Sequence, residues 1–227
     1  MALTRIGLAG ITVMGQNLAL NIAEKGFPIS VYNRTTSKVD ETVQRAKLEG
    51  NLPLYGFHDP ASFVNSIQKP RVVIMLVKAG APVDQTITTH LEQGDCIVDG
   101  GTEWYENTER SEKVMDERGL LYLGMAVFGG EEGAHHGPSM IPGGSLEAYQ
   151  YIKVILLKVS AQVPDNGWRV TYIWKGDSKT VSCSRFSPSG TRVSSSVSWS
   201  RSLLIYSASR MTRVKATWST RSWTRPG

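Results

Sequence analysis

The segment LTRIGLAGITVMG, residues 3–15, decides the fold class of this chain. Its first part has the pattern of a short buried strand, and the rest is a turn with a glycine at each end, Gly10 and Gly15. Apolar residues at helical spacing follow as far as Gly26, which indicates the end of a helix. A strand, a glycine-bearing turn and a helix in this order are typical of the first unit of a doubly wound α/β domain.

The same alternation continues to about residue 128 and predicts a Rossmann-like, doubly wound, mainly parallel sheet. RVVIMLVK, residues 71–78, is apolar enough for a central strand buried on both faces. A loop over 129–133 and a last helix over 145–160 are expected after it. The other expected strands are 3–9, 29–32, 96–98 and 120–127, and the other expected helices are 37–50, a short helix after Asp59, 82–92 and 107–118.

Charge divides the chain into two parts. Residues 1–178 hold 16 basic and all 20 acidic side chains, a balance of −4, whereas residues 179–227 hold nine basic residues and no acid. The second part also contains 14 serines and shows no sustained hydrophobic period. We therefore predict a domain over 1–178 and a basic, poorly structured tail over 179–227.

Length and composition exclude several classes of protein. The longest purely apolar run, Val72 to Val77, is far shorter than the ~20 residues that span a bilayer. Cys96 and Cys183 make no disulfide framework, and the first residues show no signal-peptide pattern. The expected location is the cytoplasm, without a membrane partner, and a plastid location is left open.

The turn from Gly10 to Gly15 is the candidate phosphate-binding segment. Glycines let the backbone approach a pyrophosphate, and the free amides at the start of the helix favour its negative charge. Thr12 stands where the fingerprint has a smaller residue. The alternative is a plain strand-to-helix turn that binds no ligand. The position of residues 10–15 at the start of an alternating strand and helix pattern favours nucleotide binding.

The end of the second expected strand indicates which dinucleotide binds. NAD sites usually carry an acid there, about 20 residues after the turn, to hold the ribose hydroxyls. This chain has Asn33, Arg34 and Thr35 instead. A guanidinium and two polar neighbours suit a 2′-phosphate, so NADP is preferred over NAD, although a single exposed arginine in a loop is the plainer alternative.

Five motifs stand in order along the chain: GITVMGQN (10–17), YNRTTSK (32–38), MLVKAGAPVD (75–84), IVDGGTEWY (97–105) and GGEEGAHHGPSMIPGG (129–144). Together they closely resemble the 6-phosphogluconate dehydrogenase family, in its plant form, over residues 2–178. This resemblance implies a decarboxylating, NADP-dependent oxidoreductase of the pentose phosphate pathway, active on the small molecule 6-phosphogluconate and assembled as a homodimer.

The resemblance also implies the residues of the site. Substrate would lie against Thr102, Phe128, Gly129 and Gly130. The cofactor would contact Gly10, Ile11, Thr12, Val13, Met14, Gly15, Asn33, Arg34, Thr35, Val77, Lys78, Ala79 and Thr102.

Four residues in or near this site depart from the family pattern. Thr102 replaces an asparagine and loses an amide, and Phe128 replaces a serine with a ring that could instead pack in the core. His135 and His136 stand where relatives often have a basic or polar pair. We interpret them as solvated loop histidines and expect no metal site.

The largest departure is an absence. Family members continue into a helix with a Lys-x-x-x-Asn and then a glutamate, the base and the acid of the reaction, whereas here the last asparagine is Asn166 and the last acid is Asp177. We expect no catalytic residue in these 227 residues and a homodimer that does not form normally. Residues after 178 are interpreted as an out-of-frame or mis-spliced reading, or a truncated copy.

Three hypotheses for function remain. The first is an NADP-binding, catalytically impaired 6-phosphogluconate dehydrogenase. The second is a non-catalytic NADP-binding protein or partner of an intact subunit. The third, in which the basic tail binds nucleic acid or an anionic membrane, is disfavoured because its charges are scattered among serines.

Overall fold

A computed structural model describes residues 3–77, 86–101, 105–162 and 169–174. The strands are Ile6–Ala9 (β1), Ile29–Tyr32 (β2), Leu54–Phe57 (β3), Val72–Met75 (β4), Cys96–Asp99 (β5), Leu121–Phe128 (β6), Ser139–Gly144 (β7) and Ile173–Trp174 (β8). The helices are Val13–Glu24 (α1), Thr36–Leu48 (α2), Pro60–Asn65 (α3), Tyr105–Glu117 (α5), Gly130–His136 (α6) and Leu146–Val159 (α7).

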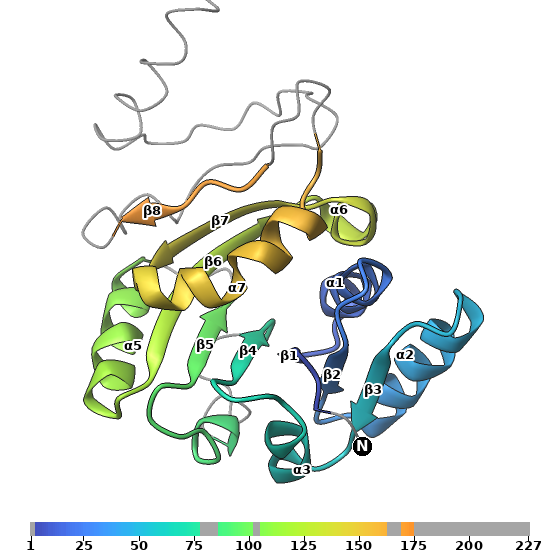
Figure 1. Cartoon of the computed structure of the whole chain (residues 1–227), viewed down its shortest axis with the longest axis horizontal. Coiled ribbons are helices and arrows are strands. Elements are labelled where there is room, and N and C mark those ends of the chain that lie inside the picture. Colours follow the sequence, from blue (N-terminus) through green and yellow to red (C-terminus); the bar gives the residue numbers. More distant parts are fainter. Residues whose placement is uncertain (1–2, 78–85, 102–104, 163–168, 175–227) are drawn as a thin grey trace, which may run out of the picture.

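All eight strands form one sheet, in the order β3-β2-β1-β4-β5-β6-β7-β8 (Figure 1). The first six in this order are parallel to their neighbours. β7 is antiparallel to β6 and β8 is parallel to β7. The chain starts at β1, winds outward to β3 and then crosses back to β4, which is the doubly wound topology that the sequence predicts.

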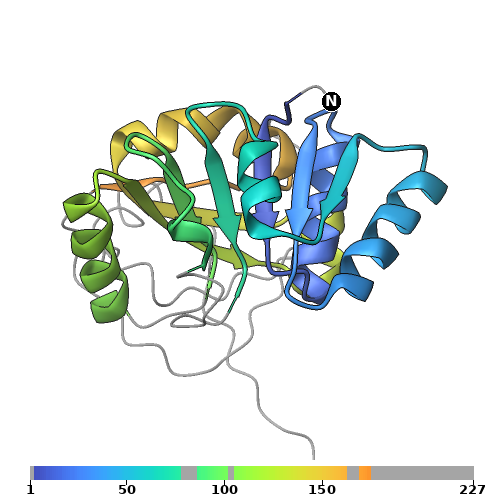
Figure 2. The ribbon, with the colours of Figure 1, turned by 90° about the horizontal axis from the view of Figure 1, so that it is seen from below.

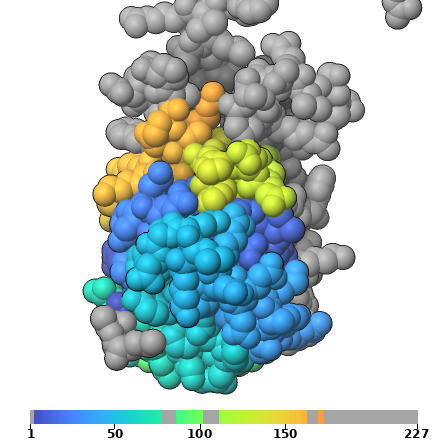
Figure 3. Space-filling model, turned by 90° about the vertical axis from the view of Figure 1, so that its right-hand side faces the viewer, coloured from blue at the N-terminus to red at the C-terminus, as the bar shows by residue number. Residues whose placement is uncertain are grey.

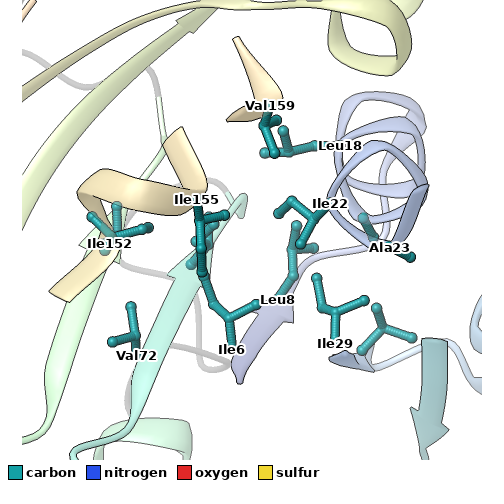
Figure 4. Close-up of a cluster of buried hydrophobic side chains, with 14 of the residues drawn as sticks. Ile6, Leu8, Leu18, Ile22, Ala23, Ile29, Val72, Ile152, Ile155 and Val159 are labelled. Atoms are coloured by element: carbon teal, nitrogen blue, oxygen red, sulfur yellow. The ribbon is translucent and has the colours of Figure 1, made fainter. Parts of the chain in front are cut away.

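Helices cover both faces of the sheet (Figures 1 and 2). The strands supply both layers by alternation: along β4, Val72 and Ile74 enter one buried cluster, and Val73 and Met75 enter the other. α1, α2 and α7 pack over the first cluster, and α3 and α5 over the second. Figure 4 shows the first cluster, in which side chains from α1 and α7 meet those of β1 and β4.

The sheet is larger than the sequence predicts. β3, β7 and β8 are absent from the predicted strands. The loop predicted over 129–133 is wrong, because α6 begins at Gly130. The predicted tail, 179–227, lies outside the described residues, and within the described residues no helix is long and apolar enough to cross a membrane.

Candidate functional site

The candidate site lies at the carboxyl edge of the parallel strands. β1 and β4 are neighbours there, and the chain order reverses between them. Ligands of open α/β sheets bind at such a switch point, beyond the carboxyl ends of the strands. Every described residue of the predicted site follows or ends one of these strands. Lys78, Ala79 and Thr102 lie outside the described residues.

The turn after β1 brings backbone against backbone. Gly10 has φ +99°, and a Cβ there would lie 2.6 Å from the carbonyl oxygen of Leu76, the residue after β4. A Cβ on Gly15 would collide with the carbonyl oxygen of Gly10. The turn therefore needs both glycines for its own packing, before any ligand is considered.

Thr12 caps α1 from the exposed side of this turn. Its Oγ1 accepts a hydrogen bond from the amide of Gly15 at 3.3 Å. Within the described residues the amides of Val13 and Met14 donate no hydrogen bond. The helix start thus presents two free donors and the positive end of its dipole, with no acidic residue in its first turn. An anion such as a pyrophosphate fits this surface.

Asn33 ties the turn to the end of β2. Its Oδ1 accepts a hydrogen bond from the amide of Ile11 at 3.1 Å, and its Nδ2 donates to the carbonyl oxygen of Thr35, also at 3.1 Å. The side chain therefore fixes the spacing between two segments that are 22 residues apart. Sequence reasoning places Asn33 at the site, but this bridging contact was not predicted.

Arg34 and Thr35 lie beside this bridge and face solvent. Both side chains are exposed, and Arg34 makes no hydrogen bond or ion pair with the described part of the chain. Thr35 is the N-cap of α2, yet its side chain makes no capping hydrogen bond. A free guanidinium and a free hydroxyl next to a helix start form a second surface for an anion.

The end of β5 is held by Asp99. Its Oδ1 accepts from the amide of Gly101 at 2.9 Å, and its Oδ2 accepts from the hydroxyl of Tyr122 at 2.6 Å. The carboxylate thereby fixes the backbone just before Thr102. Sequence reasoning assigned no role to Asp99 or Tyr122, although the run Asp-Gly-Gly after a strand was a usable signal.

Three of the substrate residues predicted by resemblance lie at the end of β6. Phe128 ends β6 and is half-buried. Gly129 (φ +137°) precedes α6, and Gly130 (φ +63°) has open space where a Cβ would stand. Asn21 of α1 is fully buried, and its Nδ2 donates to the carbonyl oxygen of Ala134 at 3.1 Å. This hydrogen bond ties α6 to α1.

The two histidines do not lie in a solvated loop. Both belong to α6, and the side chain of His135 is only 14% exposed. It contacts the carboxylates of Glu24 and Glu49. The interpretation as solvated loop residues is therefore wrong for His135, because α6 packs closely on α1.

Comparisons with known proteins agree with this geometry. A family profile described as the NAD binding domain of 6-phosphogluconate dehydrogenase matches residues 5–173. The chain is 83% identical over 181 residues to 6-phosphogluconate dehydrogenase, decarboxylating 1, of Oryza sativa, covering 78% of this chain and 38% of that protein. Its Spinacia oleracea counterpart is 79% identical, with 77% and 37% covered.

A solved structure of Plasmodium falciparum 6-phosphogluconate dehydrogenase, described in its apo form and in complexes with NADP+ and with 6-phosphogluconate, is 52% identical. It superposes with a TM-score of 0.72 over 77% of this chain and 38% of its own. The chain thus spans little more than a third of the length of these relatives. It belongs to the 6-phosphogluconate dehydrogenase family, within the region of its NAD-binding domain.

Proposed function

We propose that this chain binds NADP at the carboxyl edge of its sheet. The observation that carries the proposal is Arg34, an exposed guanidinium without a partner in the described residues, at the strand end where NAD sites usually carry an acid. The 2′-phosphate would meet Arg34 and Thr35. The pyrophosphate would meet the turn from Gly10 to Gly15, and Val77, Lys78, Ala79 and Thr102 would border the nicotinamide side.

The fit rests on features of the chain itself. The free amides of Val13 and Met14 and the glycine backbone suit a pyrophosphate. Asn33 holds the turn at a fixed distance from Arg34, so the two anion surfaces are preorganised relative to each other. When bound, the nicotinamide ring supplies a hydride acceptor. The NADP+ complex of the Plasmodium relative supports this assignment.

We also propose the family's reaction class for the intact site, the oxidative decarboxylation of 6-phosphogluconate to ribulose 5-phosphate. The substrate would lie near Thr102, Phe128, Gly129 and Gly130, with the open space at Gly130 leaving room for a ligand. No Lys-x-x-x-Asn follows residue 178, so these 227 residues alone would be catalytically impaired. A non-catalytic NADP-binding protein, or a partner of an intact subunit, is the alternative.

Fluorescence titration with NADPH and NADH tests the cofactor proposal. NADPH should bind saturably and more tightly than NADH. Arg34→Ala should weaken NADPH binding by about 10- to 100-fold, since it removes a hydrogen-bonded charge worth about 1.5–3 kcal/mol, and should leave NADH binding nearly unchanged. Lys47→Ala, an exposed cation at the far end of α2, is the matched control. Equal losses for the two cofactors would exclude the assignment of Arg34.

Turnover with 6-phosphogluconate and NADP separates the impaired enzyme from an active one. We expect no product from the isolated chain above the background of a buffer control. Measurable turnover by the purified chain would contradict the proposed loss of the base and the acid.

The domain boundary near residue 178 is a further proposal, supported by the family match that ends at residue 173. Sequencing the transcript across codons 175–185 tests it, and an uninterrupted frame with no better-matching alternative would contradict the out-of-frame interpretation. We further propose a cytoplasmic location and no normal family homodimer. Cell fractionation and analytical ultracentrifugation test these two points.

A further inference from the structure

Three helices end at one place on the surface. Glu24 is the last residue of α1, Glu49 is the C-cap of α2, and His135 lies in the last turn of α6. In Figure 3 the yellow-green surface of α6 lies against the blue surface of the first part of the chain. Helix C-termini carry partial negative charge, so a cation is favoured where three of them meet.

The three side chains point their polar atoms toward one another. Nε2 of His135 is 3.1 Å from Oε1 of Glu24 and 3.6 Å from Oε2 of Glu49. One ligand atom from each residue lies within 4.8 Å of the other two. Tetrahedral ligands at about 2.0–2.2 Å from a zinc ion are separated by roughly 3.3–3.6 Å. The two distances from the histidine bracket this spacing.

Surrounding contacts fix the orientation of the groups. Nε of Arg45 donates to Oε1 of Glu49 at 2.6 Å, which leaves Oε2 directed at His135. Arg45 is itself held by a hydrogen bond from Nη1 to Oδ1 of Asn17 at 3.0 Å. The His135 ring stacks on that of His136 with 4.4 Å between centroids. Outer contacts of this kind orient ligands and sustain metal affinity.

We propose that Glu24, Glu49 and His135 form a zinc site, with water completing the coordination. The set holds one imidazole nitrogen and two carboxylate oxygens, which suits Zn²⁺ better than the all-oxygen shells of Mg²⁺ or Ca²⁺. With neutral His135, the two carboxylates and Arg45 leave a net negative charge for the ion to offset. The ion would clip the ends of α1, α2 and α6 together, a structural role separate from the nucleotide site.

Zinc binding to the full-length chain tests the site, by competition with a chromophoric zinc indicator at neutral pH. The wild-type chain should take up zinc, and His135→Asn should lower its affinity at least about 100-fold, because losing a ligand costs no less than losing an outer contact. His58→Asn is the matched control, since this ring is 52% exposed and contacts Asp40, outside the cluster. Zinc should also raise the unfolding midpoint of the wild-type and His58→Asn proteins but not of His135→Asn.

Each outcome decides the proposal. Equal zinc affinity in the His135→Asn and His58→Asn variants would overturn it, as would a wild-type chain that binds no zinc; in both cases the cluster is only a contact of a histidine with two carboxylates. Glu24→Gln, which keeps the shape of the side chain, provides the same comparison if circular dichroism shows that His135→Asn does not fold. A preference for Ca²⁺ over Zn²⁺ would also overturn it.

Discussion

Two arginines at opposite edges of the sheet differ in every contact they make. Arg71 precedes β4 at the amino edge and is 5% exposed. Its Nη1 donates to Oδ2 of Asp95 at 2.9 Å and to Oε1 of Glu92 at 3.1 Å. Arg34 follows β2 at the carboxyl edge, is exposed, and has no partner in the described residues. The charge of Arg71 is therefore paired inside the protein, whereas that of Arg34 is available to a ligand.

The same contrast holds for backbone groups. At the amino edge, Asp95 accepts hydrogen bonds from the amides of Arg71 and Glu92, at 2.8 and 2.9 Å. At the carboxyl edge, the amides of Val13 and Met14 find no acceptor among the described residues. These open donors are available to a ligand, so the two edges should respond differently to substitution.

Arg71→Ala should cause the largest loss of stability. It leaves the carboxylate of Asp95, 3% exposed, without its ion-pair partner, and removing one member of a buried pair costs about 3–5 kcal/mol. Urea unfolding followed by circular dichroism measures the change. Arg5→Ala, an exposed arginine at the same edge, is the control and should stay within about 0.5 kcal/mol. A loss no greater than that of the control would show that the pair contributes nothing.

Asn33→Ala should have an intermediate effect, about 1–3 kcal/mol, because two hydrogen bonds worth about 0.5–1.5 kcal/mol each are lost. The glycine turn then loses its anchor, so affinity for NADPH and NADH should fall together in fluorescence titrations. Asn33→Asp is the informative companion: it keeps the acceptor for the amide of Ile11 but places a negative charge near Arg34, so NADPH should lose more than NADH. If Asn33→Ala lowered the affinity for NADPH alone, Asn33 would bind the cofactor directly and would not act by positioning the glycine turn.

The sequence was sufficient where local pattern decides structure. The burial of β4 on both faces and the helices that begin after Asp59 and Ser145 follow from local sequence pattern, and the structure confirms them. β3 was missed because only Leu54 of its four residues is buried. β7 was missed because SMIPGG resembles a loop, and its pairing with β6 supplies the order that propensity does not.

The candidate site was likewise predictable where the signals are local. The strand ends and the glycines in the sequence located the turn from Gly10 to Gly15 and the position of Arg34. The contacts of Asn33 with Ile11 and of Asp99 with Tyr122 join residues 22 and 23 positions apart. Such pairs depend on strand register, which no local pattern fixes, and the same holds for the meeting of Glu24, Glu49 and His135.

Asp59→Asn should have a small, pH-dependent effect. Asp59 follows β3 at the carboxyl edge but, unlike Arg34, has a partner: its Oδ2 accepts from the amide of Ser62 at 2.8 Å, and this hydrogen bond lowers the pKa of the carboxyl. A lowered folded-state pKa gives stability that is complete above the unfolded pKa, ~3.9, and is lost as pH falls through the folded value. The free energy of unfolding, measured from pH 6 to pH 2, should therefore differ less and less between wild type and variant as the pH falls. Glu41→Gln, an exposed acid without such a contact, should show no similar narrowing.

Arg34→Ala should have the smallest effect on stability and completes the comparison, because it makes the same chemical change as Arg71→Ala at the opposite edge. No described contact of the Arg34 side chain is lost, so the free energy of unfolding should stay within about 0.5 kcal/mol of wild type without cofactor. With saturating NADPH the two proteins should separate, since a ligand stabilises a protein in proportion to the logarithm of its affinity. A loss above about 1 kcal/mol without cofactor would mean that Arg34 stabilises the fold. The arginines at both edges would then contribute to stability, and only the size of the contribution would differ.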